Sequence, residues 1–149
     1  MKKEVEIKIF YRQRKIKLNK ELLNEKIERL KEIIEVPLKQ ISVYLVNNKI
    51  IKNLNKKFLN KNNFTDVLTF KLSRNFGEII ISVEECKKNA KVYGNTLENE
   101  ILYVLIHGIL HLMNYKDYTE KEREKMFKIQ NEIFKNLIND EAQKKFKFA

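Results

Sequence analysis

The sequence has few of the residues that mark secreted, disulfide-bonded or membrane-embedded proteins. Its 149 residues include one cysteine, one proline, three glycines and no tryptophan. Cys86 alone cannot form an internal disulfide, and no run of about 18 apolar residues is present that could span a membrane. The first residues lack the apolar stretch of a signal peptide. We therefore expect a cytoplasmic protein with no membrane partner.

Apolar residues are nevertheless abundant enough for a folded domain. Hydrophobic residues make up 43% of the chain, and residues 1–149 are expected to form a single domain with its own core. The scarcity of glycine and proline indicates short, stiff connections between helices and strands.

Positive charge is concentrated in the first part of the chain. Residues 1–62 hold 17 Lys and Arg against 7 Asp and Glu, whereas residues 63–149 hold 14 against 13. A basic region of this kind indicates a polyanionic partner such as RNA or DNA. The alternative is a genome of low GC content, which would supply both the many lysines and the many asparagines.

Hydrophobic periodicity predicts strands and helices in the first half of the chain and helices alone after residue 84. A first helix is expected to start after Asn19 and to be ended by Pro37, and the tail from residue 144 is expected to fray. The other expected elements are strands at 4–9, 41–46, 65–72 and 78–83, and helices at about 50–58, 84–93, 97–113 and 119–138.

Both histidines lie four residues apart on an apolar helix. His107 and His111 therefore share one helical face, with Cβ atoms about 5–6 Å apart. Asn114 tolerates the left-handed conformation that ends helices, so the chain can turn back and bring Asp117 toward the same point. Two imidazole nitrogens and one carboxylate oxygen leave the fourth tetrahedral position open, which is the layout of a catalytic zinc site.

Each of these three residues can also have a purely structural role. Buried imidazoles often do no more than form hydrogen bonds, and a lone aspartate in a turn is often only a turn residue. The zincin motif H-E-x-x-H also carries a general base directly after its first histidine, where this chain has Gly108. A hydrolytic site would therefore need its base elsewhere, or would rely on the metal-bound hydroxide.

A capping box supports the position of Asp117. Thr119 and Glu122 have the spacing in which a side chain and a backbone amide satisfy each other at a helix start. The residues 116–118 are then a tight connection between two helices, and Asp117 lies near the end of the histidine helix.

Four segments of the sequence resemble the YbeY-type endoribonucleases, the bacterial rRNA maturation factors. Residues 107–117, HGILHLMNYKD, resemble the family signature H-G-x-L-H-L-x-G-Y-D-H. Residues 54–58, 65–70 and 77–79 resemble the family motifs L-N-x-x-Y-R, T-D/N-V-L-S-F and G-D-I in order and spacing. The resemblance is clear over about 50–140 and extends over the first fifty residues.

This resemblance implies both a fold and an activity. The fold is α+β, with a small mixed four-stranded sheet, about five flanking helices and a metal site at the C-terminal end of a buried helix. The site implies one zinc ion per chain, held by His107, His111 and Asp117. The activity is metal-dependent cleavage of single-stranded RNA in 16S rRNA maturation and ribosome quality control, with small ribosomal subunit proteins as further partners.

The chain departs from the family pattern at two functional positions. The third metal ligand of the family is histidine, and here it is Asp117, an accepted zinc ligand. Leu59 stands where the family has an arginine taken to contact the phosphodiester. A guanidinium there would stabilise the charge that develops on the phosphoryl group, which leucine cannot do. Arg74 or Lys61 can supply that charge from elsewhere, and the identity of the catalytic side chain stays open.

The remaining candidate residues are basic. Lys56, Lys57, Lys61 and Arg74 are the predicted RNA-binding residues, although lysines in such a loop can also serve only to solvate it. Leu59 keeps a second function open, in which the protein is an RNA- or ribosome-binding assembly factor with a structural metal and little or no catalysis. A zinc hydrolase acting on a small substrate or a peptide is the third alternative.

Overall fold

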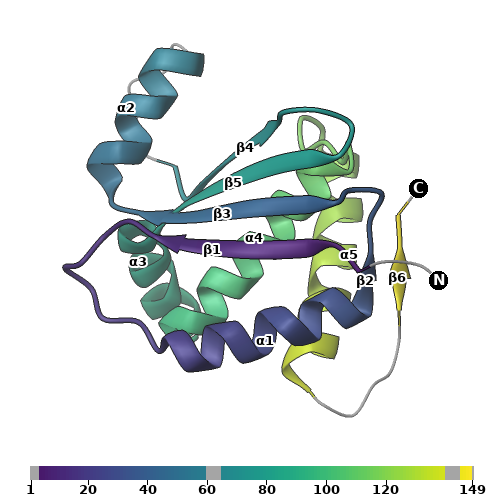
Figure 1. Cartoon of the computed structure of the whole chain (residues 1–149), viewed down its shortest axis with the longest axis horizontal. Coiled ribbons are helices and arrows are strands. Elements are labelled where there is room, and N and C mark those ends of the chain that lie inside the picture. The colour runs from purple at the N-terminus through teal and green to yellow at the C-terminus, as the bar shows by residue number, and fades with distance from the viewer. Residues whose placement is uncertain (1–3, 60–64, 140–144, 149) are drawn as a thin grey trace.

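The computed structural model describes residues 4–59, 65–139 and 145–148 of the chain. Strands and helices follow one another in the first half, and three helices and a short strand complete the second half (Figure 1). The elements are β1 (Glu6–Tyr11), α1 (Lys20–Ile33), β2 (Ile34–Glu35), β3 (Gln40–Val46), α2 (Asn48–Leu59), β4 (Val67–Lys71), β5 (Phe76–Ser82), α3 (Val83–Tyr93), α4 (Leu97–Leu112), α5 (Glu120–Ile138) and β6 (Phe146–Lys147).

Four strands form the mixed sheet that the sequence predicts. Their order is β1-β3-β5-β4, in which β1, β3 and β5 are parallel and β4 pairs antiparallel with β5. The alternation of apolar residues along β3 and β5 buries Ile41, Val43, Leu45, Ile79 and Ile81. The α+β class and the four-stranded sheet are therefore confirmed.

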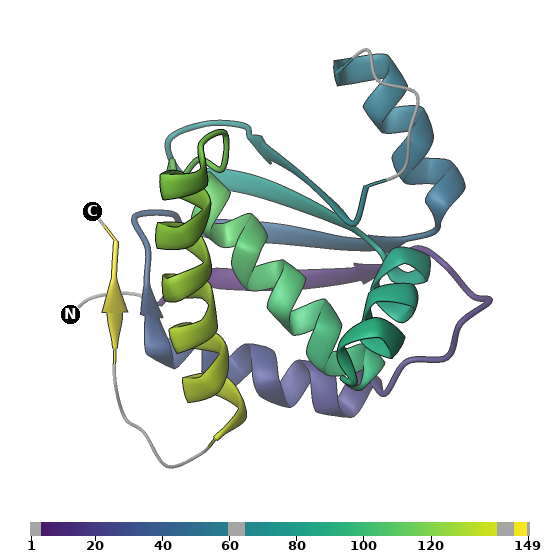
Figure 2. The ribbon, with the colours of Figure 1, turned by 180° about the vertical axis from the view of Figure 1, so that it is seen from behind.

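The helices α1, α3, α4 and α5 lie on one face of this sheet, and α2 projects from its edge (Figures 1 and 2). Of the described helices, none is both long and apolar enough to cross a membrane. Helix α4 lies between the sheet and the other helices, in contact with α1, α3, α5, β4 and β5. This position explains why α4 is apolar on nearly all sides.

Gly108 allows α4 to approach the sheet closely. A Cβ atom at this position would lie 2.9 Å from Cγ2 of Ile79 and 3.3 Å from Cγ2 of Thr69. No side chain fits there unless the packing changes. The absence of glutamate after His107 therefore has a packing reason, because residue 108 faces β4 and β5.

The sequence-based expectation was wrong at both ends of the short β2–β6 pair. Helix α1 ends at Ile33 and the chain is already extended at Ile34, so Pro37 does not end the helix. The tail does not fray throughout, since β6 pairs in parallel with β2 and Phe146 is only 9% exposed. The pairing joins segments more than 100 residues apart, and a single phenylalanine among lysines gives no periodic signal of it.

Helix α2 differs from the other helices in how little of it is packed. Ile51 is fully buried in a small cluster with Val46, Leu68 and Ile80, but Phe58 is 57% exposed. The ring of Phe58 contacts only the edge of Phe70, with centroids 5.8 Å apart. The apolar stripe that predicts α2 therefore runs beyond the body of the protein.

Candidate metal centre

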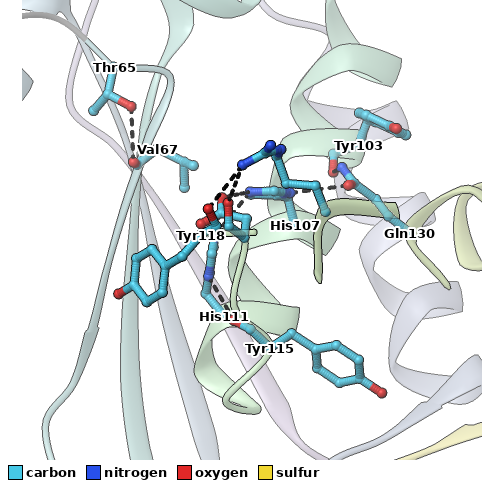
Figure 3. Close-up of polar contacts among 10 residues, drawn as sticks. Thr65, Val67, Tyr103, His107, His111, Tyr115, Tyr118 and Gln130 are labelled. Carbon is cyan, nitrogen blue, oxygen red and sulfur yellow. Dashed lines mark hydrogen bonds and ion pairs between the residues drawn. The ribbon is translucent and has the colours of Figure 1, made fainter. Parts of the chain in front are cut away.

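The last turns of α4 bring the two histidines together, as the sequence predicts. Their Nε2 atoms are 3.0 Å apart, and the two side chains point toward each other (Figure 3). The helix ends at Leu112, and Asn114 has a φ of 70°, the left-handed conformation that reverses the chain. The backbone amide of Asn114 donates to the carbonyl oxygen of His111 at 3.0 Å, which fixes this reversal.

Asp117 follows in the connection to α5. The predicted capping box is present, with Thr119 and Glu122 each accepting from the backbone amide of the other. Arg123 Nη1 also donates to the carbonyl oxygens of Asp117 and Tyr118, at 3.1 and 3.2 Å. Held in this way, Asp117 places Oδ2 3.8 Å from His107 Nε2 and 3.5 Å from His111 Nε2.

Hydrogen bonds at the other ring nitrogens define the tautomers of both histidines. Gln130 donates from Nε2 to the carbonyl oxygen of Tyr103 at 3.0 Å, so its Oε1, 3.1 Å from His107 Nδ1, is an acceptor. His111 Nδ1 lies 3.0 Å from the carbonyl oxygen of Tyr115, also an acceptor. Both Nδ1 atoms must therefore carry the proton, and both Nε2 atoms present a lone pair.

Three electron-rich atoms thus converge with no proton to share. Two Nε2 lone pairs and a carboxylate oxygen repel one another unless a cation lies between them. Tetrahedral zinc with bonds of about 2.0–2.1 Å needs ligand atoms about 3.3 Å apart. The observed separations of 3.0, 3.5 and 3.8 Å lie on both sides of that value. The group His107, His111 and Asp117 could therefore hold a metal ion.

Burial adjusts the titration of two groups at this centre. It lowers the pKa of His107, an effect that the hydrogen bond to Gln130 opposes. The imidazole is therefore kept neutral, which is the form that binds metals. Burial also raises the pKa of the Asp66 carboxyl, and attraction to His107 opposes that rise.

The metal centre opens into a cleft between α3, α4 and α5. This cavity has a volume of about 620 Å³ and includes Asp66, His107 and Asp117 in its wall. From His107 it follows α4 back to Glu100, about 10 Å along the helix axis. Helices α3 and α5 contribute aromatic and amide side chains to its two sides. A substrate can therefore reach the metal and extend away from it along α4.

The sequence model of the family described as Endoribonuclease YbeY matches residues 2–138. The chain belongs to this endoribonuclease family. A YbeY endoribonuclease of Persephonella marina is 35% identical over 129 residues, which cover 80% of this chain and 84% of that protein. One of Thermotoga neapolitana is 38% identical over 125 residues, with 81% and 84% covered.

A solved structure agrees with this assignment. The solution structure of a Thermotoga maritima protein superposes with a TM-score of 0.61 and 36% sequence identity, covering 88% of each chain. The resemblance seen in the sequence is therefore confirmed, and the fold is that of a YbeY-like protein.

The predicted RNA-binding residues lie away from the cleft, where they are described. Lys56 and Lys57 are exposed on the projecting helix α2, and Arg74 is exposed in the turn between β4 and β5. Lys61 and the side chain of Leu59 lie outside what the structure describes. Lys56, Lys57 and Arg74 are not among the described residues that line the cleft. Their role in RNA binding stays a prediction for this YbeY family member.

Two residues of the YbeY centre were missed in the sequence. Gln130 is the only polar residue on the stripe of α5 that buries Met126, Ile133 and Leu137 through helical spacing, and its burial among them was a usable signal. Asp66 lies in the T-D-V-L-T-F segment, where its backbone carbonyl accepts from Ser82 N at 2.9 Å. Nothing local to Asp66 indicates that it faces a histidine 41 positions later in the sequence.

Gln130 offers a test of the tautomer assignment. We expect Gln130→Met to weaken zinc binding by about 10- to 100-fold, because the ring of His107 loses the acceptor that orients it. Competition with a chromophoric chelator measures the affinity. Lys128→Met, at an exposed position of the same helix, is the matched control and should bind zinc like the unchanged protein. Equal affinities for all three proteins would contradict the role of Gln130.

Proposed function

We propose that the protein is a zinc-dependent endoribonuclease that cleaves single-stranded RNA and acts in 16S rRNA maturation and ribosome quality control in the cytoplasm. Zinc would be held by His107, His111 and Asp117, one ion per chain. The observation that carries the proposal is the convergence of two imidazole lone pairs and a carboxylate oxygen in a cleft of a YbeY family protein.

The chemistry of the three ligands favours zinc. Two imidazoles and one carboxylate suit a borderline-soft ion, whereas calcium and magnesium prefer oxygen ligands alone. Three protein ligands also leave a coordination position open. When bound, zinc supplies Lewis acidity toward a phosphodiester and lowers the pKa of a water molecule to about 7.

The chain's own residues would orient the site and handle protons. Gln130 and the carbonyl oxygen of Tyr115 hold both imidazoles with Nε2 turned inward. Gly108 cannot supply a general base, since it packs against Ile79. Asp66 is the carboxyl near His107 that is not one of the three ligands, and it can accept a proton from water in the cleft.

A single-turnover cleavage assay tests the proposal. Single-stranded RNA should be cut by the zinc-loaded protein, should survive when a chelator is added first, and should be cut again after zinc is restored. Duplex RNA of the same sequence should be cut far more slowly. Full zinc occupancy without cleavage would instead support the assembly factor with a structural metal.

The basic helix α2 leads to a prediction about RNA binding. Changing Lys56, Lys57 and Lys61 together to glutamine should flatten the slope of log K against log salt by up to about 2, from about 0.7 per lost phosphate contact to single-stranded RNA. Fluorescence anisotropy from low to moderate salt measures this slope. The control changes Lys26 and Lys31 of α1 to glutamine. A slope equal to that of the unchanged protein would remove α2 and the loop after it from the RNA path.

The departure at Leu59 leads to a further prediction. Leu59→Arg should raise the cleavage rate by about 10-fold, because a guanidinium near the phosphoryl group can contribute about 1–3 kcal/mol. Zinc content should not change. Leu59→Gln supplies polarity without charge and should leave the rate unaltered. A rate in Leu59→Arg no higher than in Leu59→Gln would show that another cation already serves the phosphodiester.

A further inference from the structure

The cleft beside the metal centre has an unusual lining for a protein that binds a polyanion. Two aromatic side chains on opposite helices are exposed at it, Tyr93 of α3 at 72% and Phe127 of α5 at 46%. The ring of Phe127 also lies next to His107, with centroids 6.4 Å apart. The cleft therefore offers aromatic surface on both sides of a path that starts at the metal.

Amide groups lie between these rings and are available to a ligand. The side chain of Asn89 lines the cleft and has no hydrogen-bond partner within the part of the chain that the structure describes. Asn131 accepts from the Tyr103 hydroxyl at 2.7 Å through Oδ1, which leaves its NH₂ group free to donate. An amide can both donate and accept, as the edge of a nucleobase does.

The charges of the cleft exclude phosphate from it. Among the described residues that line the cavity there is no lysine or arginine, whereas Asp66, Glu100 and Asp117 are carboxyl groups. Glu100 accepts from the Asn95 amide at 3.2 Å, deep in the wall. A phosphate bound along this wall would face carboxylates without a cation, which is unfavourable. The preferred ligand is thus flat, neutral and able to form hydrogen bonds.

We propose that this cleft is a nucleobase subsite that holds an unpaired base of the RNA next to the scissile phosphate. The inference rests on the proposed endoribonuclease function. The base lies against the rings of Tyr93 and Phe127, and the amides of Asn89 and Asn131 bind its edge. Its phosphate stays at the metal, and the sugar–phosphate backbone runs outside the cleft. A base inside a duplex cannot enter, so the subsite also accounts for a preference for single strands.

The test is binding of short RNA in which one base at a time is missing. A fluorescent single-stranded RNA of five nucleotides is compared with the same RNA carrying an abasic ribose at each position, with chelator present so that no cleavage occurs. Loss of the base at one position should weaken binding by about 5- to 100-fold, the range for loss of one stacked base.

The protein variants complete the test. Tyr93→Ala and Phe127→Leu should bind intact RNA more weakly and should lose their sensitivity to the abasic position. Val92→Ala is the matched control, since Val92 is the neighbour of Tyr93, is equally exposed at 72% and does not line the cleft. Undiminished binding by both aromatic variants, or an abasic effect that persists in them, would overturn the subsite.

The outcomes also separate this inference from the proposed function. Zinc-dependent cleavage that is unaffected by Tyr93→Ala and Phe127→Leu, together with unaltered binding, would leave the nuclease standing and remove the subsite. An abasic effect that depends on these two rings, in a protein that cuts no RNA, would support the subsite and remove the nuclease.

Discussion

His107→Ala and His111→Ala should each abolish zinc binding and, with it, RNA cleavage. Either change leaves one imidazole and one carboxylate, and two ligands hold zinc poorly. Loss of a group that merely orients a ligand already costs about 10- to 100-fold in affinity, so loss of a ligand should exceed about 100-fold. Elemental analysis of protein purified without added metal should find about one zinc per chain before the change and almost none after it.

Asp117 should matter less than either histidine. Asp117→Ala is expected to weaken zinc binding while leaving both inward-facing imidazoles in place. Asp117→His should restore or tighten binding, since histidine is the family's residue at this position. Lys116→Ala, in the same connection, is the control and should keep its zinc. Full zinc content in both histidine variants would show that the ligands are assigned wrongly.

Gly108→Glu, which would complete the H-E-x-x-H motif, should destabilise the fold rather than create a protease-like site. The new Cβ would overlap Ile79, which alone costs about 1–3 kcal/mol. The carboxylate would then be buried between α4 and the sheet without a partner, at several kcal/mol more. The total should exceed about 4 kcal/mol, a large part of the 5–15 kcal/mol typical of a domain.

Urea unfolding of the zinc-free proteins measures this loss. Val92→Glu, which introduces the same residue at an exposed helical position, should change stability by less than about 0.5 kcal/mol. Gly108→Ala should cost less than Gly108→Glu, and it should be stabilising in an Ile79→Ala background, where the methyl group fills part of the space left. A stable, zinc-binding Gly108→Glu protein would mean that residue 108 faces the cleft and not the sheet.

The parts of the centre that the sequence predicts are those determined within a few residues. The spacing of His107 and His111, the reversal at Asn114 and the capping box at Thr119 are local, and each occurs as predicted. Helical geometry and backbone sterics determine these features without help from the rest of the fold.

The parts that were missed depend on contacts between distant segments. Gln130 reaches His107 because α5 packs antiparallel beside α4, and Asp66 approaches it from the start of β4. The pairing of β6 with β2 and the position of α2 beyond the sheet edge are also consequences of tertiary packing. Periodicity gives the faces of each element, but it does not give the register in which two elements meet.

X-ray absorption at the zinc K-edge tests the metal centre most directly. Zinc bound by His107, His111 and Asp117 should show only nitrogen and oxygen neighbours at about 2.0–2.2 Å, with the outer-shell scattering of two imidazoles. His111→Ala should remove this signal together with the ion. A sulfur neighbour at about 2.3 Å would contradict the account, because Cys86, the only cysteine, is buried in the core and not at this centre.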